Sequence, residues 1–295
     1  MRTLLKLINL RLLGAILFTF VLGIGAAHHL GVRLNFLDIL LVFLVCICLV
    51  EMRDFLAAYY DHPESPWTTL HRDDELYAVL RKVKLPLVLQ AALLILTTGA
   101  VLTVILVFRK AVNIYGVVLL GVSLLVCFFS ATPPIRFEKK GYGELVESIL
   151  VANLVPSLAF ILQGAQWHIL LIMVTLPLTL IYLAMKIALS FENFGYELSH
   201  GNRSITTRMG WRRALQLHNL LILFAFILVG AFFLLGLPWG FTWPLLLGLP
   251  LGVYQIIQLQ QIAAGAKPGW VLLKWTSIGL FFAMTYLVTI SLWIR

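Results

Sequence analysis

Acidic side chains gather at the end of an apolar segment, where they could bind a metal ion. The segment at 36–60 is apolar from Val45 through Val50, then carries Glu51 and Asp54, and Asp61 follows it. On an α-helix these spacings place all three acids on roughly one flank. Charges at the edge of an apolar helix are functional candidates unless they are paired. The alternative is that Glu51 and Asp54 pair with Arg53 or a neighbouring loop, and that Asp61 begins a solvated segment.

A second polar constellation lies at the end of the apolar segment 168–190. Lys186, Ser190, Asn193 and Glu197 follow one another at intervals of four, three and four residues, with Glu192 beside them. A continuous helix would align the four on one face. The alternative for the lysine is that it extends its ammonium group out of the apolar layer.

The two constellations together indicate phosphate chemistry. Two helices that present oxygen ligands to each other, framed by Arg and Lys, suit a magnesium diphosphate, because Mg²⁺ prefers hard oxygen ligands and phosphate prefers cationic donors. A pocket of this kind within a membrane suits a lipid diphosphate.

The elements that must position these residues are predicted to be membrane-spanning helices. The chain of 295 residues is 61% hydrophobic and 12% charged, with a mean hydropathy of +0.97, which excludes an ordinary soluble protein. A spanning helix needs about 20 apolar residues. Such stretches occur at 8–28, 36–60, 85–108, 112–131, 144–164, 168–190, 215–236, 241–262 and 271–293. We therefore expect an all-α polytopic membrane protein of about nine transmembrane helices in a single domain, 1–295.

The distribution of basic residues predicts the orientation. Most of the 22 Lys and Arg residues fall in the connections on one side, and the other side holds only Arg33, Arg109, Lys110 and Arg295. Because positive residues beside spans stay cytoplasmic, we expect a cell-membrane protein with a cytoplasmic N-terminus and an external C-terminus. The net charge of +9 suits membrane lipids with anionic headgroups, and no nucleic-acid partner is expected. The three cysteines fall in predicted spans, so no disulfide framework is implied.

Two connecting segments carry a family resemblance. The stretch from Thr132 to Leu145, Thr-Pro-Pro-Ile-Arg-Phe followed by Gly-Tyr-Gly-Glu-Leu, and the stretch from Gly201 to Gly210, Gly-Asn-Arg-Ser-Ile-Thr-Thr-Arg-Met-Gly, resemble the UbiA superfamily of intramembrane prenyltransferases. The menaquinone-type branch is the most similar. The resemblance implies nine helices around a central intramembrane cavity, with an acid-rich motif on helix two and another on helix six.

The acid-rich motifs depart from the family pattern. The first, Asn-Asp-x-x-Asp-x-x-x-Asp in the family, corresponds here to Val50, Glu51, Asp54 and Ala58. The second, Asp-x-x-x-Asp, corresponds to Asn193 and Glu197. Asp61 lies nearly one turn beyond the lost third acid and could substitute for it.

The resemblance implies an Mg²⁺-dependent prenyltransferase that moves an isoprenoid chain from an allylic diphosphate to an aromatic, quinone-precursor-type acceptor. Expected metal ligands are Glu51, Asp54, Asp61, Glu192, Asn193 and Glu197, and all of these except Glu192 are also expected catalytic residues. Expected substrate contacts, assigned by loop position and charge, are Arg72, Lys82, Arg136, Lys139, Lys140, Lys186 and Arg203. At least half of the loop cations would equally serve as ordinary flanking residues of the spans.

Two other hypotheses remain open at this stage. Erosion of both motifs favours a catalytically silent relative that binds a lipid or quinone or acts as a membrane scaffold. A small transporter could use Lys186, Glu192 and Glu197 as an ion relay, although these groups gather at one membrane face and do not line a path across it.

Overall fold

The chain folds almost entirely into helices that are long and apolar. The computed structural model describes residue 7 and residues 9–68, 75–200 and 204–294. The helices are α1 (Leu10–His29), α2 (Phe36–Tyr60), α3 (Glu75–Leu80), α4 (Leu85–Phe108), α5 (Ile114–Ala131), η2 (Phe137–Lys140), α6 (Gly143–Ile149), η3 (Leu150–Leu154), α7 (Val155–Ile161), α8 (Ile169–Ser190), α9 (Phe194–Ser199), α10 (Ile205–Met209), α11 (Trp211–Leu234), α12 (Trp239–Leu246), α13 (Leu249–Ala263) and α14 (Trp270–Ile294).

The predicted membrane-spanning helices are confirmed. Within the described residues, eight helical units have the length and apolarity needed to cross a bilayer, including the continuous units 143–161 and 239–263. The 25-residue helix α2 is equally long and carries the predicted charges near its end. The chain is therefore an all-α, multi-pass membrane protein, and the predicted boundaries agree with the helices to within a few residues.

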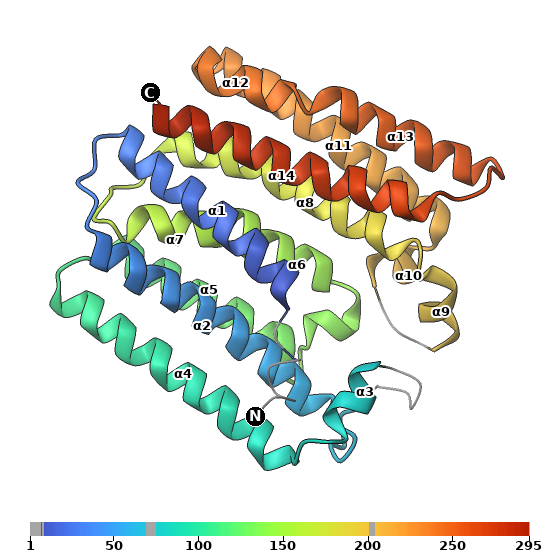
Figure 1. Cartoon of the computed structure of the whole chain (residues 1–295), viewed down its shortest axis with the longest axis horizontal. Helices are drawn as coiled ribbons and strands as arrows, with labels where there is room; N and C mark the ends of the chain where they lie inside the picture. The colour runs from blue at the N-terminus through green and yellow to red at the C-terminus, as the bar shows by residue number, and fades with distance from the viewer. Residues whose placement is uncertain (1–6, 8, 69–74, 201–203, 295) are drawn as a thin grey trace.

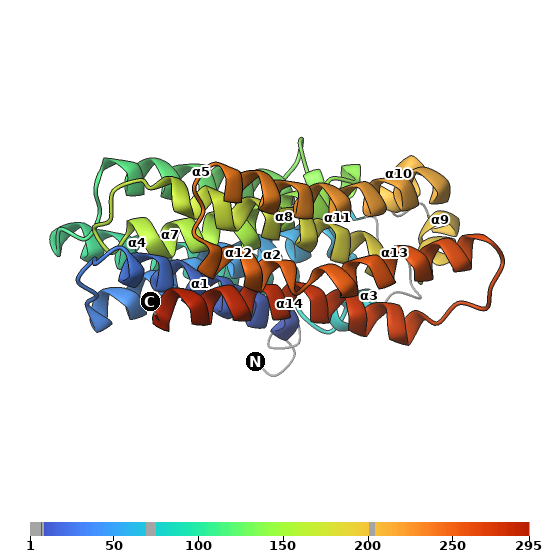
Figure 2. The same cartoon turned by 90° about the horizontal axis from the view of Figure 1, so that it is seen from above.

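The long helices lie side by side in an elongated bundle (Figures 1 and 2). Helix α2 packs extensively against α4, α8 against α11, and α1 against both α7 and α14. The approach of α1 to α7 requires a glycine, because a Cβ at Gly23 would lie 2.2 Å from the carbonyl oxygen of Pro156. Small residues are the usual means by which membrane helices come this close.

Charged connections meet at one end of the bundle, which we call the polar end. It is formed where α2 and α8 finish and where η2 leads into α6. The short helices α3, α9 and α10 lie beyond the long helices at this end (Figures 1 and 2). In the part of the chain described, Asp38 is the one acidic residue at the opposite end, where its carboxylate binds Arg109 at the end of α4.

The continuous helix predicted through Glu197 is wrong. Helix α8 stops at Ser190 and α9 begins only at Phe194, after Asn193 as its N-cap residue. The buried ring of Phe191 packs against Trp211, with the centroids 4.5 Å apart, and this contact holds the turn between the two helices. Lys186 and Glu197 therefore do not share a helix face.

Candidate functional site

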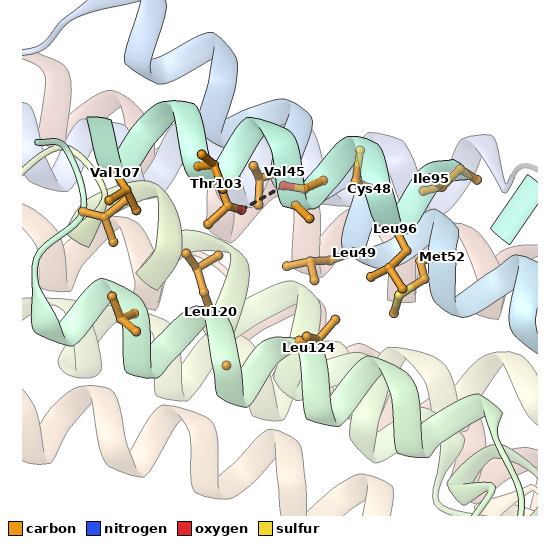
Figure 3. Close-up of a pocket in the computed structure, with 16 residues that line it drawn as sticks. Val45, Cys48, Leu49, Met52, Ile95, Leu96, Thr103, Val107, Leu120 and Leu124 are labelled. Carbon is orange, nitrogen blue, oxygen red and sulfur yellow. Dashed lines mark hydrogen bonds between the residues drawn. The ribbon is translucent and has the colours of Figure 1, made fainter. Parts of the chain in front are cut away.

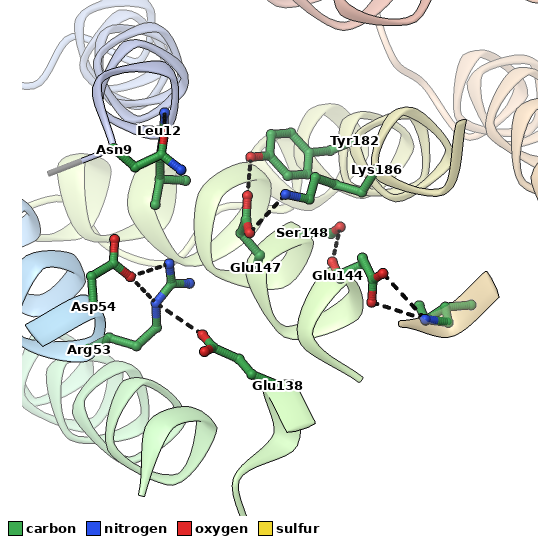
Figure 4. A network of polar contacts seen from close by, with 11 residues as sticks. Asn9, Leu12, Arg53, Asp54, Glu138, Glu144, Glu147, Ser148, Tyr182 and Lys186 are labelled. Carbon is green, nitrogen blue, oxygen red and sulfur yellow. Dashed lines mark hydrogen bonds and ion pairs between the residues drawn. The ribbon is translucent and has the colours of Figure 1, made fainter. Parts of the chain in front are cut away.

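The charged residues of α2 form the first part of a network at the polar end (Figure 4). Arg53 donates to Oδ1 of Asp54 from both Nε, at 2.8 Å, and Nη2, at 2.6 Å. Its Nε also lies 3.5 Å from Oε1 of Glu138, in η2. One guanidinium group thus joins carboxylates from two separate elements.

The second part of the network joins α6 to α8. The ammonium group of Lys186 lies 3.1 Å from Oε2 of Glu147, and the hydroxyl of Tyr182 donates to the other oxygen, Oε1, at 2.8 Å. Both carboxylate oxygens of Glu147 therefore have a partner. The charges of Arg53 and Glu147 act on each other across the space between the two parts.

The network borders space that water can enter. Arg53 is only 6% exposed, but the side chains of Asp54, Glu147, Lys186 and Glu138 keep 17%, 18%, 28% and 30% of their surface exposed. Charged groups within a helix bundle usually face such a wet space or one another, and here they do both. Burial raises the pKa of Glu138, and the nearby Arg53 guanidinium opposes that shift.

Asp61 forms a separate junction between two connecting segments. It ends α2 as the C-cap residue, and its carboxylate binds Arg136 at 2.8 Å and Lys139 at 2.9 Å. Arg136 also donates to the backbone oxygen of Trp67 at 2.8 Å. The three predicted residues Asp61, Arg136 and Lys139 are thus brought together, in an arrangement that fixes one loop to the other.

Glu197 belongs to a third arrangement, around the start of α10. Its Oε2 accepts a hydrogen bond of 2.5 Å from the hydroxyl of Ser204, the N-cap residue of that helix. Glu144 of α6 accepts a hydrogen bond from the Ile205 backbone N–H, at 3.2 Å to Oε2. Burial raises the pKa of Glu197, and the hydrogen bond from Ser204 opposes the shift. Two acids therefore anchor this helix to the bundle.

The remaining predicted residues are dispersed. Glu51 is buried, and its Oε2 has no hydrogen-bond partner within the part of the chain described. Glu192, Asn193, Lys82 and Lys140 are exposed. Arg72 and Arg203 lie outside the described residues.

Several members of the network were missed from the sequence. The sequence pattern indicated Arg53 only as a partner of neighbouring acids, and it did not identify Glu138, Glu147 or Tyr182. Glu144 and Glu147, the second of which completes the network, stand three residues apart at the start of an apolar span. The rule that selected Glu51 and Asp54, an acid at the edge of a span, would have selected these two as well.

The expected Mg²⁺ site can be tested against the donors present. Mg²⁺ requires oxygen ligands at about 2.0–2.1 Å in near-octahedral geometry. Cations already bind Asp54, Asp61 and Glu147, and Glu197 is hydrogen-bonded to Ser204. No group of three or more His, Cys, Asp or Glu side chains suited to a metal ion occurs among the described residues. The donor set therefore does not fit Mg²⁺.

An apolar groove of about 430 Å³ runs between α2, α4 and α5 (Figure 3). Its lining includes Leu49, Met52, Leu96, Leu120 and Leu124. Its main polar side chain, Thr103, donates to the Gly99 backbone oxygen at 2.9 Å, so it is already satisfied. This groove suits a hydrocarbon chain and offers nothing for acid, base or metal chemistry.

The fold resembles that of solved UbiA homologs. No protein-family model matches the sequence, and no curated protein matches it. A UbiA homolog from Archaeoglobus fulgidus, solved with GPP and Mg²⁺, aligns with a TM-score of 0.61 at 15% identity, covering 95% of this chain and 98% of the homolog. A structure described as digeranylgeranylglyceryl phosphate synthase aligns with a TM-score of 0.64 at 18% identity, covering 99% and 97%. A UbiA homolog from Aeropyrum pernix K1 gives 0.58 at 14%, covering 97% and 98%.

These alignments confirm the predicted resemblance to the UbiA superfamily in its fold. They extend over nearly the full length of both partners, so the whole helical bundle is shared. The menaquinone-type branch stays a prediction.

Proposed function

We propose that this protein is an intramembrane prenyltransferase, which moves an isoprenoid chain from an allylic diphosphate to an aromatic, quinone-precursor-type acceptor. The observation that carries the proposal is the buried charged network of α2, η2, α6 and α8, at the end of a bundle that shares its fold with UbiA homologs. One of those homologs was solved with GPP and Mg²⁺.

The reaction needs a charged site and an apolar surround, and the charged network within an apolar helix bundle supports the proposal on both counts. The C–O bond of the allylic diphosphate breaks, and its electron pair leaves with the diphosphate. The acceptor carbon then forms a C–C bond with the allylic cation and releases a proton to water at the polar end. Cationic donors stabilise the leaving group, while an apolar surround keeps water from the carbocation.

Two cations of the network are placed to receive the diphosphate. Nη1 of Arg53 makes no hydrogen bond to the described part of the chain. Lys186 forms an ion pair with Glu147, and 28% of its side chain is exposed. Phosphate oxygens are strong acceptors for both groups. The exposed loop cations Lys82 and Lys140 would add positive charge around the entrance. We propose that this polar end faces the cytoplasm.

A reconstituted assay tests the function. The purified protein in lipid nanodiscs is supplied with geranyl, farnesyl or geranylgeranyl diphosphate and a panel of aromatic acceptors, with and without Mg²⁺, and both binding and prenylated product are measured. We expect saturable binding and product. Lys186→Met should weaken diphosphate binding roughly tenfold, the loss of one charge-assisted contact. The matched control Lys110→Met, which removes an exposed cation at the opposite end of the bundle, should change it less than about twofold.

A catalytically silent relative is the second candidate, and one observation favours it. Three of the four acids that the family resemblance would assign to catalysis already have partners: Asp54 binds Arg53, Asp61 binds Arg136 and Lys139, and Glu197 accepts a hydrogen bond from Ser204. Diphosphate binding without product, across all donors and acceptors, would support this second function. Absence of any diphosphate binding would overturn the prenyltransferase.

A further inference from the structure

Arg53 occupies the position in the first acid-rich motif where a shared cation would be needed. It lies between Glu51 and Asp54 in the sequence, on a helix whose next turns are buried. Its guanidinium group bridges Asp54 and Glu138, from α2 and η2, and only 6% of the side chain is exposed. A divalent ion held between two carboxylates would make the same kind of connection.

The bridge also disfavours metal binding at these carboxylates. Oδ1 of Asp54 already accepts two N–H groups, at 2.6 and 2.8 Å, so its lone pairs are directed at nitrogen. A metal ion beside it would meet the buried positive charge of Arg53, and repulsion between like charges is strong where solvent is largely excluded. Arginine keeps its charge at any physiological pH, so this repulsion does not depend on pH.

We propose that Arg53 is a built-in replacement for the divalent cation, and that the network binds the diphosphate group of an isoprenoid diphosphate without metal. The first half concerns the chain alone. The second half rests on the proposed function, and it assigns the diphosphate to the open Nη1 of Arg53 and to the ammonium group of Lys186.

The charge balance of the polar end supports a metal-free site. Within the network, the acids Asp54, Glu138 and Glu147 outnumber the cations Arg53 and Lys186. The surrounding connections reverse this excess of negative charge. The chain has 22 basic residues and only 13 acids, and most of the basic residues lie in the connections at this end. Arg53 and Lys186 thus provide direct contacts, while the loops provide a positive field that raises the local concentration of anions.

The test of the first half uses Mn²⁺ alone as the probe. Binding of Mn²⁺ to the full-length protein in nanodiscs is followed by electron paramagnetic resonance, together with the Mn²⁺-dependent shift in thermal unfolding. We expect no saturable site in the wild-type protein. Arg53→Met frees Asp54 and Glu138 and should improve Mn²⁺ affinity by roughly tenfold or more. Arg53→Lys, the matched control that keeps a cation, should show no such gain.

Two results of the Mn²⁺ experiment would contradict the first half of the proposal. Saturable Mn²⁺ binding by the wild-type protein would overturn the proposal, and so would a folded Arg53→Met variant that gains no affinity. If that variant does not fold, the wild-type titration decides alone.

The second half is tested by geranylgeranyl diphosphate binding to the wild-type protein in EDTA and in excess Mg²⁺. We expect affinities that agree within about twofold, whereas a tenfold dependence on Mg²⁺ would overturn it. Failure to bind the diphosphate under either condition would refute the proposed function, and the Mn²⁺ result would still stand.

Discussion

The two acid-rich regions of this protein differ in structural role. On α2 the acid Asp54 is 17% exposed and is neutralised by the buried Arg53, which also reaches Glu138. After α8, the residues that would correspond to it are at the surface or in a loop anchor, with Asn193 exposed and Glu197 bound to Ser204. The first region keeps a buried charged site, while the second has become part of the scaffold. The metal-free site proposed above would account for both features, because neither region would then need to supply metal ligands to the other.

The largest expected effect is at the first region. Arg53→Met leaves Asp54 and Glu138 without their cation in a largely buried setting, and should lower the free energy of unfolding by about 3 kcal/mol. Chemical denaturation of the protein in detergent measures this. The control Arg212→Met removes an exposed arginine at the same end and should change the free energy by less than about 0.5 kcal/mol. Equal effects at the two positions would remove the distinction between a buried site and a charged surface.

The loop junction at Asp61 is expected to matter for stability and less for the site. Asp61→Asn weakens the pairing with the buried Arg136 and with Lys139, and should cost about 2 kcal/mol of unfolding free energy. Glu192→Gln, at an exposed position of the second region, is the matched control and should be neutral. If Asp61→Asn instead abolished diphosphate binding in a folded protein, Asp61 would belong to the site and the proposed division would be wrong.

A smaller and local effect is expected at the second region. Ser204→Ala removes both the N-cap of α10 and the partner of Glu197, at a cost of about 1 kcal/mol. Amide hydrogen exchange should accelerate in α10, at 205–209, with little change elsewhere. Ser199→Ala, which removes a hydroxyl bonded within its own helix, serves as the control. Loss of prenyl transfer in the Ser204→Ala variant would show that the second region still takes part in the chemistry.

The smallest effect is a pH dependence. Because burial raises the pKa of Glu138, the folded protein holds this proton more tightly than the unfolded chain does, and stability falls as the pH rises above the ordinary Glu value of 4.5. Glu138→Gln has no such proton, so its unfolding temperature should decline less between pH 5 and about pH 8. Parallel pH profiles for the variant and the wild type would indicate that Arg53 fully compensates the burial of Glu138.

Much of the fold can be predicted from the sequence, because each span is visible as a continuous stretch of about 20 apolar residues. The end of α2 beside its acids was predicted in the same way. The end of α8 at Ser190 agrees with the predicted segment 168–190, but the helix face predicted to be shared by Lys186 and Glu197 was wrong, because the chain turns at Phe191, which packs against Trp211, twenty residues away in the chain. The pairings of Arg53 with Glu138 and of Lys186 with Glu147 join residues far apart in the sequence. A single sequence contains no local signal for such contacts, although the acids themselves were visible at the start of their span.

The most direct test of the account is a structure of the protein in nanodiscs with a non-hydrolysable thiodiphosphate analogue of geranylgeranyl diphosphate, determined in EDTA. The account predicts density for the diphosphate against Nη1 of Arg53 and Nζ of Lys186, with the chain directed into the bundle. Density for the diphosphate beside Asn193 and Glu197, or its appearance only after Mg²⁺ is added, would contradict it.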